Sequence, residues 1–552
     1  MSDSQDRNVD RRTYLAAAGT AAATALAGCA GDTGEAGTTE TETSGGGGED
    51  TPTATETEEM ETQASELDVT VTMGQMDSGL DPQDHAETNT EIIVGQAYDG
   101  LMDRNKTGGI IEALATDWER VEPGVARFTL REDVTFHNGD ALTAEDVAFS
   151  IRRIVFNDVG IASPQNNDLG VLKPRDADGP PPVEAGDGEV TVRFDGLNPI
   201  VFQLFATNGP IVQQSWVEEN GQDYINRNAN GTGPFQLTNY DSGNEVSFER
   251  NPDYWGEEPA VTETTLNASS ESSTRVNRLL AEESEIVTNV PPQEVSRVES
   301  SDVAGISPVP STRIIFLQMR YDVEPFSNQT FRQALNYAVD VESIVENVLN
   351  GFGSVTAQPT LEQFTGYNPE LDPYPHDPER AEQLIEESGY AGAEITLETP
   401  IGRYLKDVEV AQAAVNNMDS LSNLSCELRQ REFSSLVQDI TTGNIEDKPN
   451  FNLLGWGNGE FDASQTIIPL LTTNGALTIL KNDEIDSLMD EAQNEPDPEA
   501  REEVLQEANS RLHELAPWVF LHQQFSVYGV ASDVAWEPRA DEFIDVDTVS
   551  RQ

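Results

Sequence analysis

Alternating apolar and polar positions, interrupted by stretches with a helical period, predict a mixed α/β body. Residues 126–139 predict two strands around a turn. Residues 143–156 predict a helix, because Thr143 can cap its first turn and Asp146 follows three residues later. Three further segments alternate or are rich in β-branched residues and predict strands: 67–74, 188–196 and 393–400.

The second half of the chain adds longer helical stretches. Residues 328–351 predict a helix or a pair of helices, and residues 377–390 predict a helix that ends at Gly389. Residues 482–530 predict two helices split at Pro496, followed by a strand. Strands and helices mix without a repeat or a clean division into two. We therefore expect one body whose chain crosses between lobes.

The N-terminal stretch RRTYLAAAGTAAATALAGCA, residues 11–30, has the layout of an export signal. It is shorter than the roughly 20 apolar residues that span a bilayer, and its Ala, Gly and Thr make a poor core helix. Arg11 and Arg12 indicate the twin-arginine route. LAGC resembles a lipobox, in which Cys29 becomes the lipidated first residue of the mature chain. The alternative is a plain cleaved signal with a chance cysteine.

Residues 30–66 contain mainly Thr, Glu and Gly and almost nothing apolar. Such a segment cannot bury enough surface to offset the entropy lost on ordering. We predict a disordered tether, extended by its own charge.

The whole chain is strongly acidic. It has 32 Lys and Arg against 99 Asp and Glu, a formal net charge of −67, and residues 67–552 alone carry 85 acidic and 29 basic side chains. Such a surface repels itself until salt shortens the Debye length to roughly 3 Å at 1 M. With only five lysines, the composition is typical of a salt-adapted, haloarchaeal type of protein. It argues against nucleic acid as a partner, because phosphate binding needs basic patches.

Motifs of known chemistry are absent from the sequence. The five histidines show no metal spacing, and there is no GxSxG elbow and no P-loop. Cys29 and Cys426 are the only cysteines, so no disulfide framework exists if Cys29 is lipidated. A binding protein is favoured over an enzyme, with no cofactor and no metal. With so many acids, a pair of carboxylates that hydrolyses glycans remains a remote alternative.

Residues 130–153, LREDVTFHNGDALTAEDVAFSIRR, closely resemble the signature of family 5 extracellular solute-binding proteins. These are the oligopeptide, dipeptide and nickel receptors of ABC importers. The resemblance covers about residues 67–540, because further elements recur in the family's order. They are AYDGLM, IEALATDWE, NGTGPFQLTNY, RNPDYWG, FRQALNYAVDVESIVENVLNGFG, DPERAEQLIEESGY and APWVFLHQ.

The resemblance implies two α/β lobes joined by a hinge, a periplasmic-binding-protein-like fold with an extra inserted domain. The ligand would lie between the lobes, and an ABC permease with its ATPase would take it up. The receptor would be a monomer, held by lipid at the outer face of the cytoplasmic membrane. The expected organisation is a signal over 1–29, a tether over 30–66, a first lobe over 67–101, 180–300 and 520–552, an inserted domain over 102–179, and a second lobe over 301–519.

A stretch that lines the cleft of peptide receptors in this family, Gly-Trp-x-Gly-Asp-x-x-Asp-Pro, is similar to residues 455–465, GWGNGEFDASQ. Its first Asp pairs with the free amino group of the peptide, and here that position is Gly459, with Glu460 one step away. Ala463 replaces the proline. The resemblance makes these positions candidate ligand residues: Gly455, Trp456, Gly459, Glu460 and Asp462.

Arg403 and Tyr404 open a predicted helix directly after the strand 393–400, at a usual place for a ligand in α/β folds. Arg403 can hold a carboxylate with two hydrogen bonds, or it can be an ordinary ion-pair partner. Three further candidates lie in stretches that face the cleft in similar proteins: Tyr98, Asn208 and Gly209.

A tethered receptor for peptides or similar small solutes is the function that these observations favour. The displaced amine-binding acid leaves room for another solute, such as an oligosaccharide or a nickel chelate. Nickel is less favoured, because no histidine occurs between His376 and His513. Two less favoured functions are a sensory receptor of the same fold and a secreted glycan hydrolase.

Overall fold

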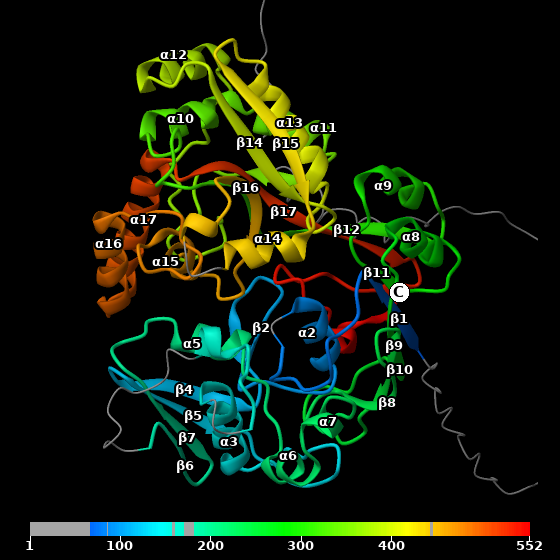
Figure 1. Ribbon diagram of the computed structural model, residues 1–552. Coiled ribbons are helices and arrows are strands. Elements are labelled where there is room, and N and C mark those ends of the chain that lie inside the picture. The colour runs from blue at the N-terminus through cyan, green and yellow to red at the C-terminus, as the bar shows by residue number, and fades with distance from the viewer. Residues whose placement is uncertain (1–66, 86, 157–159, 170–180, 442–444) are drawn as a thin grey trace, which may run out of the picture. The chain divides into compact units, whose positions relative to one another are not determined.

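The computed structural model describes residues 67–85, 87–156, 160–169, 181–441 and 445–552 (Figure 1). The predicted export signal with Arg11, Arg12 and Cys29, and the predicted tether over 30–66, lie outside the described residues. Within these ranges, none of the helices has the length and apolar character needed to cross a membrane.

An 11-stranded mixed sheet joins strands from both halves of the described chain. In spatial order, its strands are β15 (Leu424–Arg431), β14 (Ala393–Pro400), β16 (Phe451–Gly457), β12 (Ala304–Met319), β17 (Trp518–Ala531), β11 (Ile286–Val287), β1 (Asp68–Met73), β10 (Glu263–Ala268), β9 (Glu245–Arg250) and β8 (Phe235–Asp241), and β13 (Gly353–Val355) also pairs with β17. β1 is parallel to β10 and β11, and β14 is parallel to β15. β12 is antiparallel to both of its neighbours, β16 and β17.

β12 and β17 are long strands, with 16 and 14 residues, that pair with each other along most of their length. Towards one end, Arg313–Met319 of β12 also pair with β16, whereas at the opposite end Gly529 and Val530 of β17 pair with β11. The register between the two strands shifts between Pro310 and Ile314. These strands therefore connect two regions of the sheet, with an irregular stretch between them.

The two faces of β12 pack into separate hydrophobic cores, because successive side chains of a strand point to opposite faces. Ile315 and Leu317 pack in one core, and Ile314 and Phe316 pack in the other. The first core includes α10 (Gln329–Ala338), α11 (Val341–Asn347), α12 (Pro378–Ser388) and α13 (Asp407–Asp419). The second includes α14 (Phe433–Ile440), α15 (Ser464–Leu471), α16 (Asp483–Asn494) and α17 (Pro498–Leu515).

A third core lies at the other end of the sheet. Val71 of β1, Leu266 of β10 and Val527 of β17 are buried there together. Three helices contribute to it: α2 (Thr88–Val94), α8 (Ser272–Leu280) and α9 (Pro292–Glu299). In Figure 1, α8 and α9 lie beside β11 and the neighbouring end of β12.

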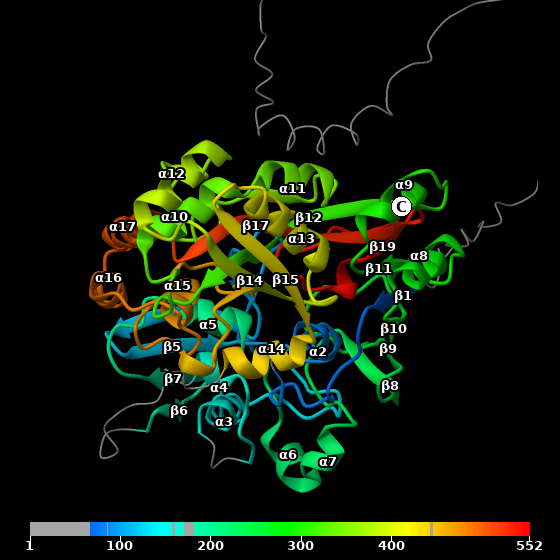
Figure 2. The same cartoon turned by 45° about the horizontal axis from the view of Figure 1, so that its top comes forward.

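A separate four-stranded sheet has its own core with Phe128 at its centre. Its strands, in the order β4, β5, β7, β6, are Ala115–Glu122, Val125–Leu130, Glu189–Arg193 and Val183–Ala185. α3 (Ala144–Val155), α4 (Asn166–Leu169) and α5 (Val201–Thr207) contribute to this core, and Figure 2 shows α3 and α5 beside the sheet. The boundary expected at residue 179 cuts through this sheet, because β6 and β7 lie beyond it.

The remaining described elements are short. They are β2 (Met102–Arg104) paired with β3 (Ile110–Glu112), β18 (Val534–Ala535) paired with β19 (Ser550–Arg551), α6 (Gln214–Asn220), α7 (Gln222–Ile225), and the 3-10 turns Ile445–Asp447 and Val546–Thr548.

Most of the predicted elements are confirmed. α3 begins with a capping box, in which Thr143 accepts from Asp146 N and Asp146 accepts from Thr143 N. Residues 328–351 form the helix pair α10 and α11, and α12 ends at Gly389 in the left-handed conformation. Only the first of the two strands predicted in 126–139 forms. The rest is a tight loop, in which Thr135 makes a single bridge to Ala141 instead of joining a sheet.

Candidate functional site

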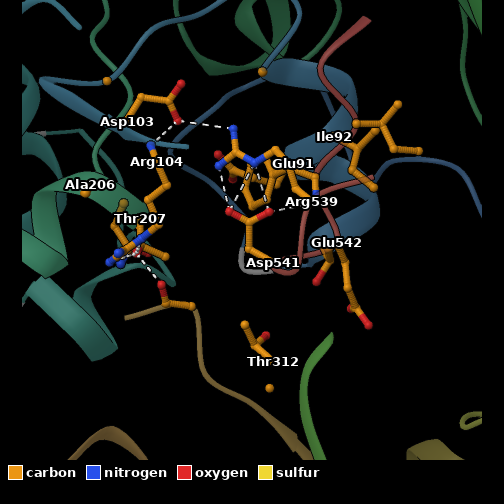
Figure 3. A pocket seen from close by; sticks show the side chains of 18 of the residues that line it. Glu91, Ile92, Asp103, Arg104, Ala206, Thr207, Thr312, Arg539, Asp541 and Glu542 are labelled. Atoms are coloured by element: carbon orange, nitrogen blue, oxygen red, sulfur yellow. Dashed lines mark hydrogen bonds and ion pairs between the residues drawn. The ribbon is translucent and has the colours of Figure 1, made fainter. Parts of the chain in front are cut away.

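A cavity of about 1110 Å³ opens between the sheet region around β12 and β16 and the part of the chain that follows α2 (Figure 3). Three groups of residues line it. The first group comes from α2 to β3 and from 205–208. The second comes from Thr312, Arg313, the 403–404 turn, α14 and 454–459, and the third comes from the C-terminal segment 539–548. Single residues from other segments complete the lining: Pro210, Pro234, Tyr254, Trp255 and Leu477.

Arg403 is placed by a turn that precedes α13. The Asp407 carboxylate accepts hydrogen bonds from the backbone N–H groups of Gly402, Arg403 and Tyr404, at 3.1, 2.7 and 3.1 Å. The prediction that Arg403 and Tyr404 open this helix is therefore wrong, because α13 begins at Asp407. The side chain of Asp407 holds the preceding residues in a turn that points Arg403 at the cavity wall.

Two guanidinium groups, those of Arg313 and Arg403, line this end of the cavity. Arg313 donates to Glu542 at 3.1 Å, and Glu542 also accepts from Ser526 at 3.0 Å. The Arg403 guanidinium lies over the rings of Tyr404 and Phe433, at 5.3 and 5.2 Å from their centroids. Within the described chain no carboxylate forms an ion pair with Arg403. One cation at this end therefore has no ionic partner.

The pKa values of Arg403 and Glu542 depend on their burial and on the charges of the neighbouring side chains. Burial lowers the pKa of Arg403, and the neighbouring Arg313 lowers it further. Burial would raise the pKa of Glu542, but Arg313, Ser526 and Arg403 together outweigh it and hold that pKa below its usual value. Glu542 is therefore ionised and pairs with Arg313. Glu542 and Asp407 also attract Arg403, which forms no ion pair of its own within the described chain.

Trp456, Tyr404 and Phe433 give the cavity an aromatic wall. Trp456 Nε1 donates to Gln465 O at 3.1 Å, which fixes the plane of its ring, and the Tyr404 hydroxyl donates to Gly455 O at 3.2 Å. A Cβ at Gly455 would lie 2.6 Å from both Tyr404 Cε1 and Ile315 Cδ1. Gly455 is therefore the residue that allows the tyrosine ring to pack on β16.

The loop that follows β16 contacts α5 across the rim of the cavity. Gly459 O lies 3.0 Å from Thr207 Oγ1, and Asn208 Nδ2 donates to Glu460 Oε1 at 3.3 Å. Glu460 is buried, with 8 % of its surface exposed, and the residues that line the cavity are Gly459 and Asn208. The candidate acid of the sequence analysis thus has its carboxylate directed at α5.

Asp462 lies behind the cavity in a buried ion pair. Arg501 of α17 donates to both of its carboxylate oxygens, at 2.7 and 2.8 Å, and Ser464 donates to it at 2.6 Å. With 0 % of its surface exposed, Asp462 is held as a structural group. Asp462 is not among the residues that line the cavity.

Two of the three remaining candidates line the cavity, Tyr98 and Asn208. The Tyr98 hydroxyl accepts from the backbone N–H of Asn230 at 3.1 Å. Gly209, at φ 90°, packs against Leu169, Phe205 and Ile154 of the smaller sheet's core, outside the group of lining residues.

Sequence reasoning missed the C-terminal segment, which supplies a second charged group (Figure 3). Arg539 donates to Asp541 at 2.6 Å and to Asp545 at 2.8 Å, and it contacts Asp103 at 3.4 Å. Burial raises the pKa of Asp545, against the attraction of Arg539. Three acids thus surround one cation. The only sequence signal for this group is the spacing of acids after Arg539 in RADEFIDVD.

Two further carboxyl groups, Asp99 and Glu91, line the same part of the cavity. Asp99 accepts from Trp255 Nε1 at 2.8 Å and from Thr232 at 2.7 Å, and burial raises its pKa to about 6. Glu91 projects from α2, and burial raises its pKa to about 8. The cavity therefore has an acid-rich end opposed to the arginines of the aromatic wall.

Among the described residues, no group of three or more His, Cys, Asp or Glu side chains is arranged so that it could hold a metal ion.

The family model for bacterial extracellular solute-binding proteins, family 5 Middle, matches residues 109–477. The chain belongs to this family. It is 23% identical to heme-binding protein A of Haemophilus influenzae over 452 residues, 77% of this chain and 81% of that protein. It is 22% identical to the glutathione-binding protein GsiB of Pectobacterium atrosepticum over 471 residues, 82% of this chain and 88% of that protein.

The solved structure of the ABC transporter-associated periplasmic binding protein DppA from Helicobacter pylori, in complex with the peptide STSA, matches with a TM-score of 0.74. The match covers 88% of this chain and 98% of DppA at 21% identity. The solute-binding protein thus has the predicted two-lobed α/β fold of periplasmic binding proteins.

Proposed function

We propose that this solute-binding protein captures peptides, or similar small solutes with a free carboxylate, in the cavity between its lobes and delivers them to an ABC importer. The observation that carries the proposal is the Arg403 guanidinium, which lines the cavity over Tyr404 and Phe433 without an ionic partner in the described chain. A carboxylate can accept two parallel hydrogen bonds from such a group. The aromatic wall around it suits the apolar side chains of a peptide.

Isothermal titration in molar salt with di- to pentapeptides tests this proposal. Arg403→Ala should bind peptides with a free C-terminus about ten-fold or more weakly than the wild type, because a charge-assisted hydrogen bond is lost. C-amidated peptides should bind the two proteins equally. Arg429→Gln is the matched control, since Arg429 is 63 % exposed and pairs with Glu398 outside this cavity.

The peptide part of the proposal would be overturned if the titration showed no heat of binding with any peptide but a heat of binding with an oligosaccharide. The aromatic wall would then serve as a platform for sugar rings. The receptor would keep its role as a trap for solutes, and the ligand would change.

We further propose that the protein is a lipoprotein of a salt-adapted cell, exported through Arg11 and Arg12 and anchored through Cys29 at the outer face of the membrane. A single lipid chain anchors only marginally, so a two-chain lipid is expected. Mass spectrometry of the membrane-bound protein should find the lipid on Cys29. Cys29→Ser should release the protein into the medium, and continued membrane retention of that variant would contradict the anchor.

The proposed partners are the permease and ATPase of an importer, which take up solute from a monomeric receptor. Adjacent genes for a permease and an ATPase would favour transport over a sensory role of the same fold. Deleting such a permease should abolish growth on the bound peptide as sole nitrogen source.

A further inference from the structure

The carboxyl groups that line the cavity differ in what neutralises them. Asp541, Asp545 and Asp103 surround Arg539, and Glu542 pairs with Arg313. Glu112 lies 3.6 Å from Arg131, in an exposed pair. These acids already have cationic partners within the protein, so a ligand would have to compete for them.

Three other carboxyl groups on the lining, those of Asp99, Asp547 and Glu91, form no ion pair with a Lys or Arg side chain of the described residues. Of these three, Glu91 lies on α2. The one ion-pair contact of its carboxylate that the described residues provide is to His85 Nε2, at 3.4 Å. His85 is buried, and burial lowers the pKa of its imidazole, so at neutral pH the ring carries no charge. Neither ring nitrogen of His85 forms a hydrogen bond with a side chain of the described residues. The protein therefore offers Glu91 a neutral neighbour instead of a cation.

The geometry of α2 directs Glu91 into the cavity. Thr88, Glu91, Ile92 and Gly95 all line the cavity, and these positions lie on one face of a helix. The Glu91 side chain keeps 22 % of its surface exposed, and Glu91 is one of the residues that line the cavity. Figure 3 shows Glu91 and Ile92 on α2, beside the segment that carries Arg539 and Asp541.

We infer that Glu91, rather than Glu460, is the carboxylate that receives an ammonium group of the ligand. The inference rests on the proposed function, because it assigns the second end of the ligand whose carboxylate meets Arg403. Glu460 is engaged by Asn208 on the rim, whereas Glu91 lies on the lining with a neutral partner.

The charge distribution supports a cationic group at this end. Around Arg539 three acids oppose one base, and Asp99 adds a carboxyl group held by the neutral donors Trp255 and Thr232. An ammonium beside Glu91 therefore enters a region with excess negative charge. With the cavity empty, burial keeps the pKa of Glu91 near 8, and an ammonium would keep the carboxylate ionised at neutral pH.

The ammonium can come from the peptide N-terminus or from a lysine side chain. Four pools of random di- to pentapeptides separate these sources: free or acetylated at the N-terminus, each with or without lysine. The lysines of the acetylated pool remain unmodified. Each pool is offered to the wild type and to Glu91→Gln, Glu460→Gln and Glu87→Gln, and retained peptides are quantified by mass spectrometry. Glu87 is the matched control, because it is an exposed acid next to the same helix and accepts from Ser78.

The wild type should retain peptides with a free ammonium about ten-fold or more over those without one, and Glu91→Gln should lose this preference. Loss confined to the free N-terminal pools assigns the α-ammonium, and loss confined to the lysine-containing acetylated pool assigns the side chain. Glu87→Gln and Glu460→Gln should keep the preference, with unchanged thermal unfolding as evidence of folding. If Glu91→Gln keeps the preference, or if Glu460→Gln alone loses it, the inference is overturned while the proposed function stands. If the wild type retains no pool, the peptide part of the proposed function fails.

Discussion

Asp462 and Arg501 form a buried two-point contact, in which Arg501 Nη1 donates to Oδ2 at 2.7 Å and Nη2 donates to Oδ1 at 2.8 Å. The contact joins the loop after β16 to α17, 39 residues further along the chain. Arg501 Nε also donates to Ala492 O at 3.1 Å. The contact therefore links two helices and the loop beneath the aromatic wall.

Asp462→Asn should destabilise the protein by about 3–5 kcal/mol, because it leaves a buried guanidinium without its counter-ion. Denaturant unfolding in molar salt measures this loss. Asp439→Asn is the control, since Asp439 is 41 % exposed in its pair with Arg431 and its loss should cost about 0–1 kcal/mol. Equal losses in the two variants would show that the Asp462 pair is no more stabilising than a surface pair.

Gly108 is expected to determine how closely its own loop can approach the loop after β16 at the rim of the cavity. Its φ of 86° lies in the left-handed region, and a Cβ there would collide with the ring of Phe461 from the loop after β16. Arg104 lies over the same ring, 5.1 Å from its centroid. Gly108→Ala should therefore disfavour the closed state and weaken ligand binding, with the loss mainly in a faster dissociation rate.

Gly188→Ala provides the control for backbone strain alone. Gly188 has φ 71°, and a Cβ there would meet no atom within 4 Å. Gly188→Ala should lose about 1–2 kcal/mol of unfolding free energy, the cost of a left-handed alanine, and Gly108→Ala should lose at least as much because its collision with Phe461 adds to that cost. Only Gly108→Ala should change the dissociation rate of the bound peptide, and equal dissociation rates in the two variants would argue against the rim contact.

The sequence predicts an element well when the interacting residues are close together along the chain, and poorly when they are far apart. α3, α12 and the pair α16 and α17 were predictable, because caps, glycine stops and Pro496 act within a few residues. The site needs contacts between distant segments. Arg539 reaches the cavity only because the chain after β17 returns to Asp103, 436 residues away in sequence.

Contacts between distant segments also explain why two candidate ligand acids, Glu460 and Asp462, are not among the residues that line the cavity. The resemblance to family 5 receptors placed Asp462 and Glu460 in a ligand loop, but their partners Arg501 and Asn208 come from α17 and from the end of α5. Arg403 was found because the end of a strand is a local feature. Its turn was missed because the Asp407 carboxylate folds back on the preceding backbone N–H groups.

Salt should stabilise the folded chain. Residues 67–552 carry 85 acidic and 29 basic side chains, so the compact state repels itself when screening is weak. The unfolding free energy should rise steeply with KCl up to about 0.5 M and more slowly above it, since the Debye length falls from about 10 Å at 0.1 M to 3 Å at 1 M. Sucrose at matched osmolality is the control for solvent exclusion. An unfolding free energy that responds equally to sucrose and to KCl would contradict an electrostatic origin.

Glu91 should give the empty receptor a characteristic dependence of stability on pH. Burial raises its pKa to about 8 in the folded state, whereas the unfolded value is the ordinary 4.5. Between these values unfolding releases a proton from Glu91, so the unfolding free energy falls as pH rises, by up to about 1.4 kcal/mol per pH unit. The contribution of the protonated Glu91 carboxyl group to the unfolding free energy is fully present below pH 4.5 and is lost as pH rises through 8.

The neighbouring His85 acts in the opposite direction. Its pKa is lowered by burial, so its contribution rises with pH and is complete above its ordinary value of 6.5. The carboxyl group of Asp99 has the same sign as Glu91 but a raised pKa of only about 6. Asp545 has the same sign, and burial raises its pKa to about 7, so it titrates together with Glu91 between pH 6.5 and 8. A comparison with Glu91→Gln cancels the contribution of Asp545. Subtracting the unfolding free energies of Glu91→Gln from those of the wild type should give a difference that falls with pH across this range, and two parallel curves would show that Glu91 is ionised in the empty cavity.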